Sequence, residues 1–306
     1  MNRRSLPRAD NLCTIRDINF ICDGERKNTL RELLGEIEKR RFSTGAGHPW
    51  TKSNLNEYVS SLVFLKLASR VHGGIFLISY GRRLRKITGD HGTFLQKTLN
   101  DVERRFFRET LLSNERFLDF LKIFTDGVLI SSAEELAMIG KETSLAEENI
   151  RDKVIKMFGY FDKREFSDKG VFINWSLSVE LVGMDYDKKT YFPTYDHDIS
   201  EYVFLHALYD AYNRLKDERT LRAEVYRVRT EVCKKLKIPD SFFRDKLWTL
   251  NAQAPHIVSL ERAPLMKFGS TKYGLISKNS ETYYYLRLGG KPNDISIPFK
   301  RKNIRD

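Results

Sequence analysis

The hydrophobic pattern of this chain is helical over most of its length and is interrupted by short apolar runs beside polar turns. The clearest helix signal is the pair Thr29 and Glu32, which has the Thr-x-x-Glu spacing of a capping box. Apolar residues then recur at helical spacing, at Leu30, Leu33, Leu34 and Ile37. This pattern predicts an amphipathic helix to about Arg41, where the chain enters a glycine-rich loop.

A second helix and a hairpin are predicted next. The helix begins near Thr51 or Ser53, and its apolar face contains Leu55, Tyr58, Val59, Leu62 and Val63. The pair Gly73-Gly74 permits the positive φ angles of a tight turn, and the apolar run that follows it is typical of a strand. The spacing of Tyr80, Leu84 and Ile87 predicts a closing helix.

The same order, helices and then two strands, is predicted twice more. In the second stretch a helix begins near Asn114, and further capping boxes pair Ser132 with Glu135 and Ser144 with Glu147. Strands are predicted there at 160–166 and 171–175, followed by a linker over 179–198 with a strand at 176–182. In the third stretch the pattern predicts helices at 201–216, at 221–236 and from Pro239, and a hairpin that pairs 256–262 with 281–288. The predicted fold class is mainly α with small β-hairpins (α+β).

This order of elements resembles the winged helix-turn-helix superfamily, in which one helix enters the major groove of DNA and a hairpin flanks it. The tract 55–87, LNEYVSSLVFLKLASRVHGGIFLISYGRRLRKI, carries the resemblance most clearly. The tract is also similar to the recognition modules of FokI-type restriction endonucleases, which arrange several winged-helix domains in series ahead of a nuclease domain. The resemblance implies three tandem winged-helix domains, at 26–92, 93–198 and 199–306, behind a basic N-terminal arm at 1–25.

Charge and composition narrow the class of partner. The 306 residues carry a net charge of +12, and such a basic surface attracts polyanions such as DNA. The cysteines Cys13, Cys22 and Cys233 lack metal-ligand or disulfide spacing and are expected to be inert thiols. No apolar run approaches the ~18 residues of a membrane span, and no signal peptide or phosphate-binding glycine loop is present. We therefore expect a cytoplasmic, nucleoid-associated protein without a cofactor, a bound metal or a membrane partner.

Candidate DNA contacts lie on the second helix and around the first hairpin. On the helix, the polar positions opposite the apolar face are Lys52, Ser53, Asn54, Asn56 and Ser60. Asparagine can pair with two atoms of adenine, and serine and lysine can contact bases or phosphates. Around the hairpin the candidates are Arg70, His72, Arg82, Arg83, Arg85 and Lys86, and residues 70–86 contain no Asp or Glu. Arginine suits phosphates and narrow minor grooves, so these cations are expected to face outward together.

Weaker candidates are spread over the rest of the chain. They are Arg3 and Arg4 in the arm, Lys163 and Arg164 in the second unit, and Arg244, Lys246 and Asn251 in the third. Acidic residues at Glu147, Glu148 and Asp152 favour a spacer or protein-contact role for the second unit, and that alternative stays open.

A nuclease centre of the PD-(D/E)xK type needs an Asp and a Glu-x-Lys on adjacent strands. Glu25-Arg26-Lys27 supplies the second part, and the stretch at 15–22 is strand-like. Asp17, within that stretch, or Asp23, just after it, is a conceivable partner. Such a tripeptide is common by chance, so we expect no catalytic centre. If the chain is an enzyme, a metal-dependent DNA endonuclease is the class that these residues indicate.

The sequence thus predicts a double-stranded DNA-binding protein, acting as a recognition subunit for a separate enzyme or as a regulator in a defence, restriction or replication setting. Two alternatives stay open, namely a protein-interaction scaffold within a larger assembly and a restriction-type nuclease.

Overall fold

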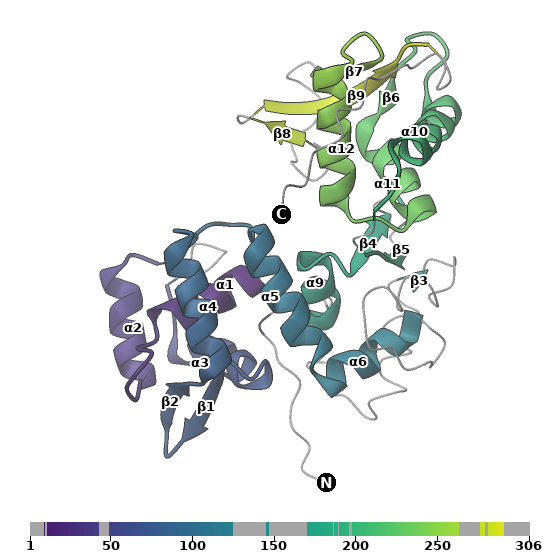
Figure 1. Ribbon diagram of the computed structural model, residues 1–306. Coiled ribbons are helices and arrows are strands. Elements are labelled where there is room, and N and C mark those ends of the chain that lie inside the picture. The colour runs from purple at the N-terminus through teal and green to yellow at the C-terminus, as the bar shows by residue number, and fades with distance from the viewer. Residues whose placement is uncertain are drawn as a thin grey trace, which may run out of the picture. The chain divides into compact units, whose positions relative to one another are not determined.

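The computed structural model describes residues 9, 11–42, 49–124, 145–146, 170–185, 187–188, 190–195, 198–262, 276–278 and 281–290. The chain divides into two compact units, unit 1 (Met1–Val182) and unit 2 (Gly183–Asp306). Each consists mainly of helices with small antiparallel sheets, which confirms the predicted α+β class (Figure 1). Among the described residues, no helix combines the length and the apolar character that a membrane crossing requires.

The first part of unit 1 contains four helices and a hairpin. They are α1 (Leu12–Ile21), α2 (Leu30–Lys39), α3 (Lys52–Phe64), β1 (Ala68–Val71), β2 (Gly74–Leu77) and α4 (Ser79–Asp90). Both hydrogen bonds of the predicted capping box between Thr29 and Glu32 are present at the start of α2. Thr51 is the N-cap of α3, and its side chain accepts a hydrogen bond from Asn54 N. Local capping chemistry therefore sets these two helix starts as predicted.

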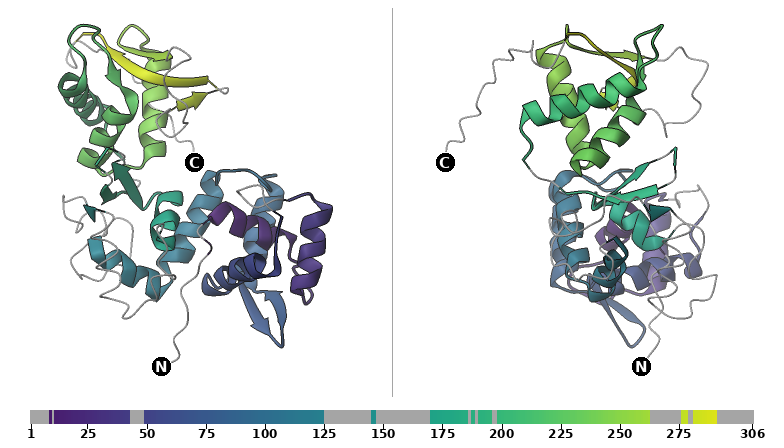
Figure 2. Two further views of the ribbon diagram at one scale, coloured as in Figure 1. Left: turned by 180° about the vertical axis from the view of Figure 1, so that it is seen from behind. Right: turned by 90° about the vertical axis from the view of Figure 1, so that its right-hand side faces the viewer.

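Strand β2 has a neighbour on each side. Ile75 faces Arg70 in the ladder with β1, and it also forms an antiparallel bridge to Asn28, just ahead of α2. The strand order is therefore Asn28, β2, β1, with the side chain of Ile75 fully buried. The hairpin projects from the helices of this unit in every view (Figures 1 and 2).

Helix α1 is the centre of this part of the core. Leu12, Ile15 and Ile18 are fully buried, and α1 packs against both α3 and α4. The strand predicted at 15–22 is therefore wrong, because apolar residues three apart line one side of a helix. Within residues 1–25, where a basic N-terminal arm was expected, α1 forms part of the core instead.

The remainder of unit 1 is held together by aromatic side chains. Its elements are α5 (Asp101–Leu112), α6 (Glu115–Leu121), a short 3₁₀ helix η1 (Lys122–Phe124), β3 (Leu145–Ala146) and α9 (Val171–Ser178). Asn114 caps α6 as predicted. On α9, Phe172 lies with its ring centroid 5.7 Å from that of Phe64, 5.5 Å from Phe117 and 5.3 Å from Phe120. The strand predicted at 171–175 is wrong, because a short apolar run buried on several sides does not distinguish strand from helix.

A hairpin occupies the stretch predicted to be a linker. Strand β4 (Val182–Asp185) neighbours β5 (Thr190–Pro193). The strand predicted at 176–182 begins only at Val182, because Ser176 and Ser178 belong to α9 and donate to its carbonyls. The other predictions for this region, the strand at 160–166 and the capping boxes at Ser132 and Ser144, lie outside the described residues.

Unit 2 matches its predicted order closely. Its elements are α10 (Glu201–Leu215), β6 (Ala223–Glu224), α11 (Val225–Leu236), α12 (Asp240–Gln253), β7 (Val258–Arg262), β8 (Ile276–Lys278) and β9 (Glu281–Leu288). The predicted pairing of the last two long strands is confirmed, since β7 and β9 form an antiparallel ladder. Leu286 of β9 is fully buried and faces Ala223 of β6 on one side and Leu260 of β7 on the other.

Residues 12–77 of unit 1 and 201–288 of unit 2 therefore share one order: helix, a bridge or short strand, helix, helix, strand, and a last strand in the middle of the sheet. Unit 2 adds β8 before its last strand, and unit 1 continues with α4 and further helices. Ile75 and Leu286 occupy equivalent central positions. The third helix has the same spacing of buried residues in both units, with Leu55, Val59 and Leu62 in α3 and Phe243, Leu247 and Leu250 in α12. The two stretches share this layout in their burial pattern and strand order.

Candidate nucleic-acid interface

The outward side of α3 carries small polar residues. Leu55, Val59 and Leu62 face the core, so Ser53, Asn56 and Ser60, at i, i+3 and i+7, lie together on the other side. Half-buried Glu57, four positions after Ser53, lies on this side too. Lys52 is exposed in the first turn next to them. Asn54 is also exposed, but it lies two positions from Asn56 and so does not share its face.

Strand β1 contributes an arginine to the same surface. The guanidinium of Arg70 donates a hydrogen bond to Asn56 Oδ1 at 2.6 Å, and the Ser60 hydroxyl donates to the Asn56 backbone oxygen at 2.8 Å. We call this surface the α3–β1 face, and it consists of Lys52, Ser53, Asn56, Ser60 and Arg70. The face thus contains candidates that the sequence predicted separately, on the helix and in the hairpin.

The hairpin turn is shifted by one residue from the predicted pair Gly73-Gly74, so the prediction is confirmed for Gly73 and wrong for Gly74. His72 (φ 46°) and Gly73 (φ 71°) have the positive φ angles, whereas Gly74 already pairs with Val71 in the ladder. Positive φ at both central residues is the pattern of a type I′ turn, which matches the twist of the strands. The Lys27 side chain lies along Gly74, and its Nζ donates to the His72 backbone oxygen at 3.4 Å. Lys27, from the loop between α1 and α2, thus places a positive charge beside the exposed turn.

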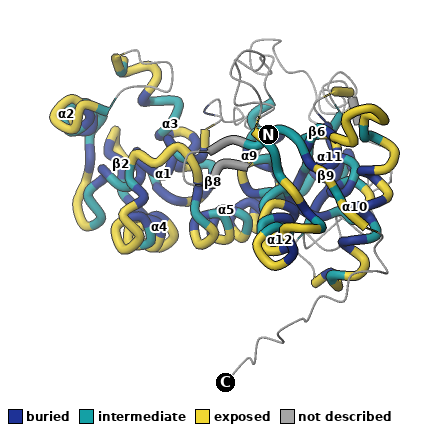
Figure 3. Tube along the Cα trace, turned by 90° about the horizontal axis from the view of Figure 1, so that it is seen from above, coloured by how far each residue is buried: buried dark blue, intermediate teal, exposed yellow. Residues whose placement is uncertain are grey.

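The tube of α4 has exposed positions along its length (Figure 3), and all four of the predicted cations on it are exposed. They do not form one patch. Arg82 and Arg85 both lie close to Gly24, and Arg85 Nε donates to the Phe20 backbone oxygen at 3.2 Å. Arg83 lies on another side, with NH1 3.7 Å from Glu109 Oε2 and its guanidinium 5.4 Å from the ring centroid of Phe106.

The prediction that these residues face outward together is therefore wrong for Arg83. Neighbouring positions on a helix point about 100° apart, so Arg82, Arg83, Arg85 and Lys86 cannot all share one direction. Arg83 also has an acidic neighbour from α5, a contact that the absence of acids in residues 70–86 could not reveal.

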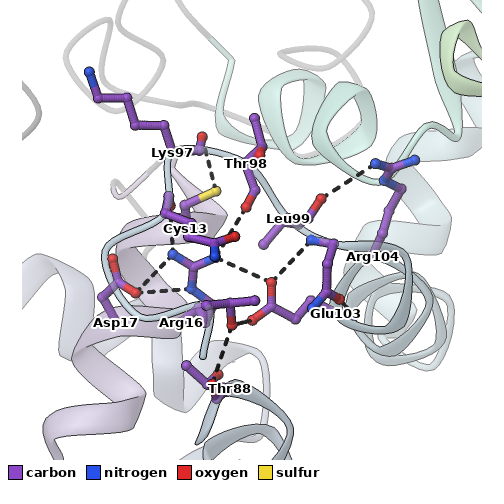
Figure 4. A network of polar contacts seen from close by, with 12 residues as sticks. Cys13, Arg16, Asp17, Thr88, Lys97, Thr98, Leu99, Glu103 and Arg104 are labelled. Atoms are coloured by element: carbon purple, nitrogen blue, oxygen red, sulfur yellow. Dashed lines mark hydrogen bonds and ion pairs between the residues drawn. The ribbon is translucent and has the colours of Figure 1, made fainter. Parts of the chain in front are cut away.

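A buried polar network fastens α1 to the start of α5 (Figure 4). Arg16 is fully buried, with NH2 2.9 Å from Asp17 Oδ1 and NH1 3.2 Å from Glu103 Oε2. It also donates to the backbone oxygens of Gln96 and Thr98, at 2.6 and 3.2 Å. Burial raises the pKa of Asp17, and the hydrogen bond and charge of Arg16 oppose that rise. A buried, compensated network of this kind serves structure.

The proposed nuclease residues do not assemble. Asp17 is on helix α1, where its Oδ1 also accepts from Leu95 N at 3.1 Å. Glu25 is exposed in the turn after α1, and Lys27 lies against the hairpin, so neither is on a strand beside Asp17. The expected pair of adjacent strands is absent from these residues, and the described part of the chain contains no cluster of three metal-ligating side chains.

The cysteines are free thiols, as expected. Burial raises the pKa of Cys13 to about 11 and that of Cys22 to about 12. The nucleophilic thiolate is therefore scarce at neutral pH, and neither side chain is suited to catalysis.

In unit 2 the predicted contacts are engaged within the protein. Arg244 Nε lies 3.5 Å from Asp245, and Lys246 Nζ lies 3.9 Å from Glu201. Asn251 Nδ2 donates to the Val258 backbone oxygen at 2.7 Å, so this amide fastens the end of α12 to β7 and is not a reader of bases. Trp248 is partly buried and packs against the core of unit 2.

Four predicted residues, Arg3, Arg4, Lys163 and Arg164, lie outside the described residues. Two contacts were not predicted from the sequence: that of Lys27 with His72, 45 positions away, and that of Asn56 with Arg70, 14 positions away. Partners so far apart leave no local signal in the sequence. Comparison with protein-family models, with curated proteins and with solved structures gave no match to this chain.

Proposed function

We propose that the chain binds double-stranded DNA through unit 1 as a winged-helix domain, with α3 in the major groove and the β1–β2 hairpin beside the backbone. The observation that carries the proposal is the order α1, Asn28, α2, α3, β1, β2 with β2 in the middle of the sheet. This arrangement puts a helix with a polar outward side next to a projecting hairpin, which is the geometry by which such domains dock on DNA.

The charges of the α3–β1 face support the proposal. The cations Lys52 and Arg70 belong to the face, and Lys27 and His72 lie at the adjoining turn. Lys52, Arg70 and Lys27 together outnumber Glu57, which lies on the same outward side of α3. Small hydroxyl side chains at Ser53 and Ser60 leave room for close approach to base edges. The net charge of +12 adds a long-range attraction to phosphates.

The repeated layout extends the proposal to tandem winged-helix domains with unequal roles. The cations Arg244 and Lys246 of unit 2 are paired with carboxylates, so we assign the main DNA contact to unit 1. A chain with one DNA-reading domain and other domains of the same layout fits a recognition subunit or a regulator.

The test is binding of the full chain to duplex DNA over a range of salt concentrations. Log affinity should fall linearly with log salt, with a slope of about −0.9 per phosphate contacted. The triple variant Lys27→Ala, Lys52→Ala and Arg70→Ala should bind more weakly and with a flatter slope. A charge-matched control on unit 2, Lys188→Ala, Arg219→Ala and Lys235→Ala, should change both much less.

Replacing Arg82, Arg83 and Arg85 together with Ala should weaken binding less than the triple variant that includes Lys27, because these arginines point in different directions. Wild-type protein that retains no duplex even at ~50 mM salt would overturn the proposal.

A second candidate function, a protein-interaction scaffold, is favoured by one feature of unit 2. Tyr202 and Val203, adjacent on α10, are 63% and 44% exposed, and exposed apolar neighbours can mark a protein contact. Tight association with a partner that Tyr202→Ser weakens, without DNA retention at ~150 mM salt, would favour this function.

A further inference from the structure

We infer that Arg70 reads a guanine in the major groove and that Asn56 is the positioning residue that holds its guanidinium. The inference rests on the proposed function of unit 1 and goes beyond it, because it names the base that is recognised and the side chain that recognises it. It also replaces the expectation that Asn56 reads adenine.

The hydrogen bond between the two side chains decides the assignment. To read adenine, an asparagine accepts from N6 through its Oδ1 and donates to N7 through its amide nitrogen. In this protein Asn56 Oδ1 already accepts from Arg70 NH2 at 2.6 Å. Adenine would have to compete with a charge-assisted hydrogen bond for that oxygen, and such bonds are roughly twice as strong as neutral ones.

Arg70 retains what guanine needs. A guanidinium has five N–H donors in a rigid planar fork, and guanine presents two acceptors, O6 and N7, in the major groove. The bond to Asn56 uses one donor and fixes the plane of the fork, which lowers the entropy that a bidentate contact would otherwise lose. The side chain is exposed and lies beside the middle of α3, where its neighbours on the face, Ser53 and Ser60, are too short to compete for the same base.

The position of Arg70 separates it from the phosphate-contacting part of the hairpin. The tip of the hairpin is His72-Gly73, with Lys27 beside it, whereas Arg70 is further back on β1 and bound to α3. A cation fixed to the groove-facing helix is placed for bases, and cations at the tip are placed for the backbone.

Unit 2 lacks this device. Aligning the buried residues of α12 with those of α3 puts Arg244 where α3 has Asn56, and Asp245 where α3 has Glu57. Arg244 cannot accept a hydrogen bond from a second guanidinium, so it cannot take the place of Asn56. The sequence preference of the chain should therefore come from the Asn56–Arg70 pair in unit 1.

The experiment starts with selection of bound duplexes from a random library by the wild-type full chain, which should enrich a guanine at one position. Replacing that base with 7-deazaguanine removes the N7 acceptor and keeps O6, so it should weaken wild-type binding roughly tenfold through loss of one hydrogen bond of the bidentate contact. Arg70→Lys keeps the charge but not the fork, so it should lose the discrimination while keeping the salt slope. Asn56→Ala should also reduce the discrimination at an unchanged slope, and the control Arg82→Lys should change neither.

The outcomes separate the assignments. If Arg70→Lys keeps full discrimination against 7-deazaguanine, Arg70 is a phosphate contact and the inference fails. If an adenine is enriched instead and only Asn56→Ala abolishes that preference, Asn56 is the reader and the inference also fails. If the wild type binds no duplex at all, the proposed function fails together with the inference. Melting temperatures equal to that of the wild type show that a variant's loss of discrimination does not come from misfolding.

Discussion

The backbone carbonyl of Leu67 lies so close to Gly81 that a Cβ atom on residue 81 would overlap its oxygen. Leu67 follows α3, and Gly81 is in the first turn of α4. Asn19 of α1 donates to the Gly81 backbone oxygen at 2.9 Å, so three segments of unit 1 meet at this glycine. The absence of a side chain lets α4 begin directly after the hairpin.

We predict that Gly81→Ala destabilises the protein by about 2 kcal/mol or more, because the clash is with backbone and cannot be relieved by a rotamer change. Urea denaturation measures the effect. The matched control is Gly35→Ala in α2, where an added Cβ meets nothing within 4 Å and should stabilise the helix by up to about 1 kcal/mol. Equal stability of Gly81→Ala and wild type would refute this packing of α4.

Because Arg16 is fully buried in a polar network, a single substitution there should strongly lower the stability of the protein. Arg16→Met should cost about 3–5 kcal/mol, since it leaves Asp17 and Glu103 buried without their cation. Thermal and urea unfolding report the loss. Lys39→Ala is the control, because its pair with Glu36 is exposed and should be worth under about 0.5 kcal/mol. Similar losses in both variants would mean that the network is not important for the stability of unit 1.

A non-glycine residue in the left-handed region ends α3. Lys66 has φ 54° and is exposed, and the next residue, Leu67, donates back to the Leu62 carbonyl. Glycine adopts this conformation without steric cost, so Lys66→Gly should raise the free energy of unfolding by about 0.5–1 kcal/mol. Lys66→Ala, which removes the same side chain but keeps a Cβ, should give no such gain in a melting experiment. A gain of equal size from both would point to charge and not to backbone strain.

The capping box of α2 should make stability depend on pH. The backbone N–H of Thr29, and then its hydroxyl, donate to Glu32 and hold the pKa of that carboxyl below its usual value. A carboxyl with a lowered folded pKa stabilises the protein above its unfolded pKa of about 4.3, and this stabilisation is lost as the pH falls through the folded pKa.

The measurement is the melting temperature of wild type and Glu32→Gln between about pH 7 and pH 2. The wild type should be the more stable at neutral pH, and the difference should shrink through the acidic range, since the glutamine does not titrate. Glu38→Gln, at an exposed position in the same helix, serves as the control. A difference that stays constant down to the lowest pH would contradict the role of the ionised carboxylate.

The sequence by itself determined the elements whose causes are local. Thr29, Thr51 and Asn114 cap the helices that their neighbours predict, and the alternation in 281–288 predicts a strand. These signals are local because a cap or a periodic face involves residues within a few positions of one another. The order of helices and hairpins followed from them, and with it the α+β class.

Only the tertiary structure decided which surfaces these elements share. It made 171–175 a helix, because aromatic neighbours from α3 and α6 surround Phe172. In the folded protein Asp17 is buried and pairs with Arg16, and Arg83 lies near Glu109. Arg70 donates a hydrogen bond to Asn56. The physical reason is that a side chain's partners are set by the direction in which its element packs, and residues many positions apart in the sequence supply those partners.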